Sequence, residues 1–195
     1  ALFANRIDDV VGSRLIDAGG PDAGDETYLR ENIGELLLVG AFARADLRLF
    51  GADSRWSLAP TLEWTRGQQY SDFVDPFTGE KTFDDVPGQR IPPLHGALVL
   101  RHDTRAGALG WVELTTSFAL AQERLSPQDL GDPRIDPQGT DGWLTLDLDC
   151  GGALGSAGSR WFAGVHNLFD VEYRVHGSGF DAPGLGAVAG LRLVR

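Results

Sequence analysis

The stretch ELLLVGAFARADLRL, residues 35–49, alternates between apolar and polar side chains with a period of two. Its apolar odd positions are Leu37, Val39, Ala41, Ala43, Ala45, Leu47 and Leu49, and its even positions include Phe42, Arg44, Asp46 and Arg48. Successive side chains of a strand point to opposite faces, so the stretch predicts a strand with one apolar and one mostly polar face. The run is longer than the roughly 5–6 residues typical of a soluble strand.

The same alternation recurs in residues 56–65, 112–120, 144–150 and 187–193, whereas residues 94–102 are apolar on both faces. Short connections follow some strands, and long ones, residues 17–27, 67–93, 123–141 and 170–184, follow the others. Short turns at one end and long loops at the other indicate an all-β, antiparallel up-and-down meander of about eight strands. Pro60 lies inside a predicted strand, where its missing N–H leads us to expect a β-bulge.

The composition excludes several classes of protein. The net charge of −11 argues against a nucleic-acid partner, which would need a basic face. Cys150 is the one cysteine, so the chain has no internal disulfide and no cysteine-built metal site; we interpret it as a small apolar residue of a strand. No apolar run approaches the roughly 18 residues of a transmembrane helix, which leaves a membrane β-barrel possible.

Alternation alone fits two environments. In a soluble β-sandwich the apolar face points inward, and in an outer-membrane barrel it meets lipid while polar residues line the lumen. Strand length, loop asymmetry and tryptophans near strand ends favour the membrane. These tryptophans are Trp56, Trp64, Trp111, Trp143 and Trp161. The predicted lumen face carries Arg44, Asp46, Arg48, Glu63, Glu113, Asp147 and Asp149.

Five segments, in order along nearly the whole chain, resemble the C-terminal part of the barrel of TonB-dependent outer-membrane receptors. They are LFANRIDDVV, YLRENIGELLLVGAFARADLRL, GQRIPPLHGALVLRH, AQERLSPQDLGDPRIDPQGTDGWLTLDL and VHNLFDVEYRVHGSGFDAPG. The resemblance implies that residues 1–195 are the last strands of a barrel of roughly 22 strands, without the plug domain. The chain begins in strand-like sequence, which we interpret as a mature segment or one whose front is missing.

The resemblance also implies a function. The parent protein would lie in the outer membrane of a Gram-negative bacterium and import a scarce ligand such as a ferric siderophore, haem or cobalamin. Its expected partners are outer-membrane lipid, this small metal chelate, and TonB through the missing N-terminal plug. No enzymatic activity and no cofactor are expected. Two alternatives remain open, a stand-alone eight-stranded outer-membrane barrel and a soluble β-sandwich binding module.

Two groups of site residues follow from the resemblance. Structural residues of the family motifs are Ile91, Pro92, Pro93, Asn167, Leu168, Phe169 and Asp170. Candidate ligand contacts in the extracellular loops are Arg90, Arg124, Arg134, Tyr173, Arg174 and His176. We expect Asn167 and Asp170 to bond the backbone where strand pairing stops, and Phe169 and Tyr173 to lie at the membrane interface.

Other chemistry is weakly indicated. The carboxylate pairs Asp8/Asp9, Asp84/Asp85 and Asp147/Asp149 are interpreted as solvated loops and a polar lumen. The histidines His95, His102, His166 and His176 are scattered and lack the spacing of a metal site, so none is predicted. No nucleophile elbow, phosphate loop or dinucleotide fingerprint is present in the sequence.

Overall fold

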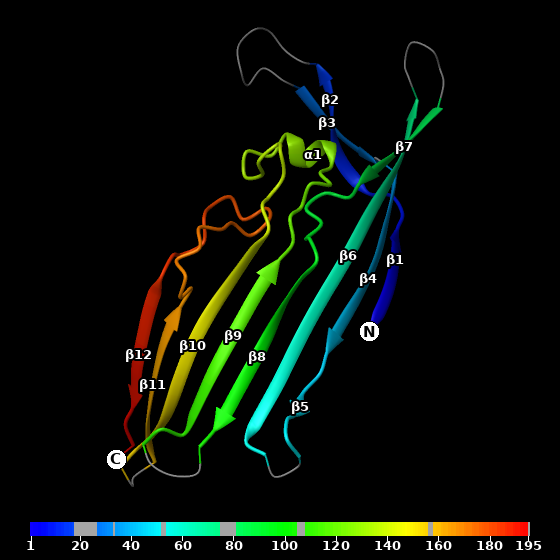
Figure 1. Ribbon diagram of the computed structural model, residues 1–195. Coiled ribbons are helices and arrows are strands. Elements are labelled where there is room, and N and C mark those ends of the chain that lie inside the picture. Colours follow the sequence, from blue (N-terminus) through cyan, green and yellow to red (C-terminus); the bar gives the residue numbers. More distant parts are fainter. Residues whose placement is uncertain are drawn as a thin grey trace.

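The chain folds into one extended antiparallel sheet (Figure 1). The computed structural model describes residues 1–17, 27–32, 34–51, 54–74, 81–104, 108–155 and 158–194. Within 12–33 and 71–85 it describes the backbone of these residues but not their side chains. Eight strands follow one another across the sheet: β1 (Leu2–Ile7), β4 (Glu35–Arg44), β6 (Trp56–Val74), β8 (His95–Asp103), β9 (Trp111–Ala119), β10 (Trp143–Leu154), β11 (Ser159–His166) and β12 (Gly186–Arg192). This order confirms the predicted all-β meander.

The remaining elements are short. The short β5 (Leu47–Arg48) and β7 (Lys81–Pro87) both pair with β6, while β2 (Val11–Asp17) and β3 (Thr27–Asn32) form a separate hairpin. The one helical turn in the described residues is α1 (Pro127–Leu130). No helix in the described part of the chain is long and apolar enough to cross a membrane.

The long connections lie at one end of the sheet and the short connections at the other. The β2–β3 hairpin, β7, α1 and the segment that joins β11 to β12 all lie at one end, and the short turns lie at the other (Figure 1). The sequence predicted this asymmetry. Two of the long connections contain strand pairs: the separate β2–β3 hairpin lies between β1 and β4, and β7 pairs with the far half of β6 before the chain reaches β8.

The sheet is open. Strands β1 and β12 lie at its opposite edges, so the two ends of the eight-strand path do not meet (Figure 1). In hydrocarbon, an unpaired edge would leave backbone N–H and C=O groups without partners. These eight strands therefore do not by themselves form a closed barrel in this structure.

The strand register places most charged side chains of the sheet on one face, the polar face; Arg6 and Arg66 are on the other. Glu63 pairs with His95, His95 with Ala119, and Ala119 with Trp143, which makes one row across four strands. The same alternation puts most predicted lumen residues on this face, namely Arg44, Arg48, Glu63, Glu113, Asp147 and Asp149. The opposite, apolar face carries Leu37, Val39, Leu58, Leu62, Trp64, Leu98, Leu114, Leu144, Leu146 and Leu148.

No other layer of the described residues covers the apolar face. Leu98 is 43% exposed, Leu144 51% and Trp64 42%. Among the described residues, Ala119 and Ile135 are the only buried hydrophobic side chains. A soluble sandwich would pack its apolar face inward against a second sheet, so this arrangement contradicts the sandwich alternative.

Two sequence expectations were wrong. No bulge forms at Pro60, since the β6–β8 register runs through it without a shift. Instead, Pro60 accepts a hydrogen bond from the Ala45 N–H at 3.2 Å and cannot return one, and the neighbouring strand is interrupted between β4 and β5. Trp64 lies inside β6 rather than near its end, and the register puts Trp111 and Trp143 on the polar face.

Candidate functional site

The most elaborate part of the polar face lies at the end with the long connections. A cavity of about 370 Å³ opens there, and we call it the polar-face cavity. Its lining includes Glu63, Pro93, His95, Trp143, Val175 and His176. The residues come from β6, β8, β10, the segment before β8 and the segment between β11 and β12, so the cavity exists only in the folded sheet.

Glu63 and His95 face each other across the β6–β8 pair. The His95 Nδ1 lies 2.9 Å from the carbonyl oxygen of Pro93, and since a carbonyl only accepts, Nδ1 donates this bond. In the neutral imidazole the Nε2 atom then carries a lone pair, 3.8 Å from the Glu63 Oε2 atom. This separation is too long for a direct hydrogen bond.

A second histidine enters the cavity from the segment between β11 and β12. The His176 Nδ1 lies 2.9 Å from the Thr140 hydroxyl oxygen, while its Nε2 is buried without a hydrogen-bond partner. Burial lowers the pKa of His176, and the nearby negative charge of Asp129 acts in the opposite direction. The ring is therefore neutral near pH 7.

Tyr173 holds this segment against the sheet. Its ring packs on Trp143 with 4.4 Å between centroids and a tilt of 39°. Because Trp143 is on the polar face, Tyr173 lies on that side of the sheet. The expectation that Tyr173 lies at the membrane interface was therefore wrong. Arg174, a predicted ligand contact, donates from Nε to Asp181 at 2.9 Å within the same segment.

The Asn167–Asp170 turn closes β11 with the expected side-chain bonds to the backbone. Asn167 Oδ1 accepts from the Val171 N–H at 2.9 Å, and its Nδ2 donates to the Val171 and Pro183 carbonyls. Asp170 Oδ1 accepts from the Leu185 N–H at 2.7 Å, just before β12 begins.

The neighbouring residues of this motif have different surroundings. Leu168 donates its N–H to the Leu146 carbonyl at 2.8 Å, which ties the turn to β10. Phe169 is 69% exposed.

Two of the predicted ligand contacts, Arg90 and Arg134, converge on one carboxylate, that of Asp132. Arg90 donates to Asp132 Oδ2 at 2.6 Å, and Arg134 donates to both Asp132 oxygens at 2.8 Å. The Asp132 side chain is only 7% exposed. The buried Asp129 also accepts from the Arg90 N–H at 3.0 Å. These bonds join the segment before β8 to the one that carries α1.

The remaining predicted arginine and the Ile91–Pro93 motif complete the same framework. Arg124 donates to the Gly67 carbonyl at 3.0 Å and to the Gln68 side chain. The Ile91 carbonyl accepts from Gln122 Nε2 at 2.6 Å, and both Pro92 and Pro93 line the polar-face cavity. All four predicted arginines thus bond to groups of this chain.

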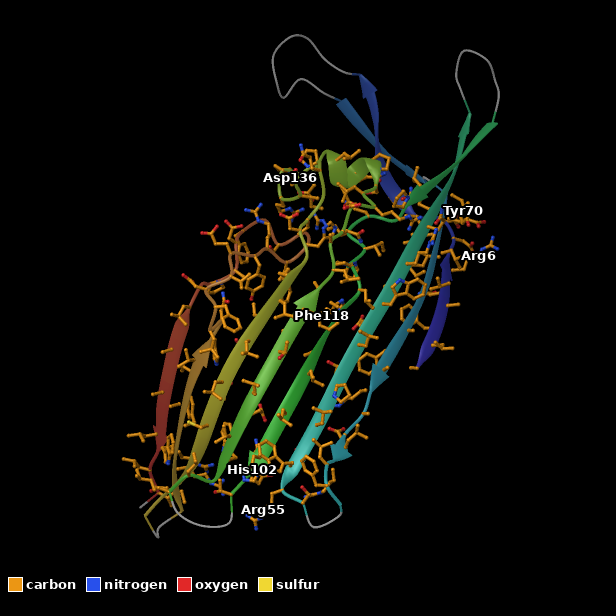
Figure 2. All side chains as sticks on the ribbon, viewed as in Figure 1. Arg6, Arg55, Tyr70, His102, Phe118 and Asp136 are labelled. Atoms are coloured by element: carbon orange, nitrogen blue, oxygen red, sulfur yellow. The ribbon has the colours of Figure 1, made fainter. Side chains whose placement is uncertain are left out.

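Above the polar-face cavity lies a second, acidic concavity, which we call the rim pocket. It measures about 480 Å³, and its lining includes Asp136, Asp141, Glu172, Arg174 and Asp181. Asp136 lies among the long connections (Figure 2). Val171 to Arg174 line the rim pocket and Val175 and His176 line the polar-face cavity, so this segment separates the two.

Further along the polar face the charges are paired. Arg101 bonds to Glu113 at 3.2 Å and to Asp103 at 3.0 Å. The His166 Nε2 lies 3.1 Å from Asp149 Oδ1, and Asp147 Oδ1 accepts from the Asn167 N–H at 2.7 Å.

The other groups noted in the sequence lie elsewhere. Asp8 pairs with Arg6 at 2.8 Å, and the side chains of Asp84 and Asp85 lie outside the described ones. His102 lies on the apolar face near the short turns, against Trp56 (Figure 2). Within the described residues, no group of three or more His, Cys, Asp or Glu side chains lies close enough to share a metal ion.

The sequence did not indicate that His95 and His176 share a cavity, since 80 residues separate them. The face on which Trp143 lies could nevertheless be predicted from the sequence. Leu144, Leu146 and Leu148 fix the even positions of that strand as apolar, which places Trp143 on the other face.

The one-layer meander, its exposed apolar face and its long connections at one end are the architecture of a portion of the wall of a large antiparallel β-barrel. A solved structure with this fold is the copper transporter OprC, with a TM-score of 0.69 and 17% sequence identity. The match covers 97% of this chain and 26% of OprC, so the chain spans about a quarter of that protein. At this identity the likeness concerns the fold. No family model and no curated protein sequence matches the chain.

Proposed function

We propose that this chain is the C-terminal part of the barrel of a TonB-dependent receptor in the outer membrane of a Gram-negative bacterium. The observation that carries the proposal is the separation of faces, with uncovered leucines on one face and Glu63, Glu113, Asp147 and Asp149 on the other. Such a sheet is stable where lipid meets the first face and water meets the second. The proposal assigns the chain no catalytic step.

The open edges support a larger barrel. Strands β1 and β12 each pair on one side only within the described sheet. Further strands of the same protein would satisfy these edges and complete a barrel of roughly 22 strands. The plug that contacts TonB would also come from outside this sequence.

The proposed cargo is a scarce, metal-containing ligand. A ferric siderophore, haem and cobalamin fit the resemblance to TonB-dependent receptors, and the structural likeness to a copper transporter adds a metal ion itself. The chain has no methionine, and its one cysteine, Cys150, lies on the apolar face. A soft Cu(I) site of thioether and thiolate ligands is therefore not built from these residues, whereas imidazole and carboxylate groups are present.

Residue-by-residue labelling in membranes tests the orientation. Single cysteines at Leu148 and Asp147, in a Cys150→Ser background, should differ sharply in the full-length protein. The cysteine at 147 should react with a charged, water-soluble maleimide, whereas the cysteine at 148 should not, because lipid excludes the reagent and suppresses the thiolate that reacts. Equal reaction of both cysteines with the charged reagent would contradict the proposal. Import that persists in cells without TonB would contradict the energy coupling.

A further inference from the structure

The Glu63–His95 pair contains two hydrogen-bond acceptors that face each other. With Nδ1–H donated to the Pro93 carbonyl, the neutral His95 presents the Nε2 lone pair toward the Glu63 carboxylate, 3.8 Å away. Two lone-pair donors at this separation repel each other unless a cation or a proton lies between them. No arginine or lysine of the described residues pairs with Glu63.

We propose that His95 and Glu63 bind a divalent transition-metal ion, of the Cu²⁺, Ni²⁺ or Zn²⁺ type, on the polar wall of the barrel. A metal-bound histidine usually donates its other ring N–H to a backbone carbonyl or carboxylate, which fixes the tautomer and aims the lone pair. The Pro93 carbonyl does this for His95. An imidazole with a carboxylate suits borderline metals, and Cu²⁺ binds such sites most tightly in the first-row series.

The site has room for additional ligands. It lies in the polar-face cavity of about 370 Å³, where water can complete the coordination of a metal held by two side chains. Two protein ligands give modest affinity, which suits a position on a path where cargo must bind and then leave. The acidic rim pocket above would raise the local concentration of cations.

A second His–carboxylate pair on the same face provides a contrast. The His166 Nε2 lies 3.1 Å from Asp149 Oδ1, within hydrogen-bonding distance, so its N–H is directed at the carboxylate. The Asp149 carboxylate is thus already bonded to the ring, and the lone pair of the neutral His166 lies on Nδ1, which is not the atom beside this carboxylate. We therefore expect the metal at His95 and not at His166.

This inference deepens the proposed function, on which it rests for its role in import, by naming a metal ion as the cargo class. The test is titration of the purified full-length protein in detergent with Cu²⁺, followed by calorimetry and electron paramagnetic resonance. The wild-type protein should bind Cu²⁺, and the spectrum of the bound Cu²⁺ should show nitrogen hyperfine splitting from one imidazole. Glu63→Gln and His95→Asn should each weaken this binding at least tenfold.

The matched controls are Glu113→Gln and His166→Asn, which change the same residue types on the same face and should stay within twofold of the wild type. Circular dichroism and heat-dependent gel mobility would show that all variants are folded. Unchanged Cu²⁺ binding in folded His95→Asn, or loss in His166→Asn alone, would overturn the proposal. Cu²⁺ binding at His95 without TonB-dependent uptake would sustain the site and overturn the proposed import function.

Discussion

Asp149 lies directly over Gly164, its partner on the neighbouring strand, and from there its carboxylate reaches the His166 ring. A Cβ atom at position 164 would overlap the Asp149 carboxylate, so this glycine makes room for the Asp149–His166 contact.

Gly164→Ala should therefore displace the Asp149 carboxylate and break its contact with His166; because the end of this side chain can rotate away, the cost is that of the lost hydrogen bond, about 1 kcal/mol. The midpoint of thermal unfolding in detergent measures the effect. Gly186→Ala is the matched control, because a Cβ atom there would lie 3.8 Å from the Gly184 carbonyl oxygen, which is an ordinary contact. Equal midpoints for the two variants would show that the crowding at Gly164 is unimportant.

Asp132→Asn should loosen the connections at the rim. The carboxylate is nearly buried and binds both Arg90 and Arg134, so the amide would leave donors facing donors. We expect a loss of about 1–3 kcal/mol and faster trypsin cleavage after the two arginines. The control Asp136→Asn, at an exposed position of the same segment, should be cleaved by trypsin at the wild-type rate. If trypsin also cleaves Asp132→Asn at the wild-type rate, Asp132 does not hold these connections together.

Acidification should loosen the segment at residues 171–185. Since burial lowers the pKa of His176 from its ordinary value of 6.5, the unfolded chain takes up this proton at a higher pH than the folded protein. The stability that depends on the neutral ring is complete above about pH 6.5 and is lost as the pH falls through the folded pKa.

Hydrogen exchange of the Ala182 amide, which bonds to the Tyr173 carbonyl at 2.8 Å, reports on this segment. Its exchange should accelerate relative to a β9 amide as the pH falls below 6.5, after correction for the intrinsic rate. His176→Gln should abolish the extra acceleration. If the variant retains it, another group is responsible.

Asn167 combines a left-handed backbone, with φ of 51°, and side-chain bonds to the Val171 and Pro183 backbone. Asn167→Ala should lose both advantages and cost about 2–3 kcal/mol of unfolding free energy. Asn167→Gly relieves the backbone strain and isolates the lost hydrogen bonds, so its loss should be smaller. If Asn167→Gly loses as much unfolding free energy as Asn167→Ala, the whole effect comes from the side-chain hydrogen bonds and none from backbone strain. Chemical denaturation measures both.

The alternation in residues 35–49 and its repeats determined the strands, the two faces and the positions of the long connections. This was possible because a period of two is a local property of extended chain, whatever the neighbouring strand is. The Asn167 and Asp170 bonds were also predictable, since they bridge residues close to the turn or to the start of the next strand.

Tertiary structure alone decided which distant groups meet. His95 and His176 share a cavity, and Arg90 and Arg134 share Asp132, because the register and the paths of three connections bring separate parts of the chain together. Pro60 avoids a bulge because its missing N–H faces the gap between β4 and β5. The open edges likewise depend on pairing between strands, which local sequence does not encode.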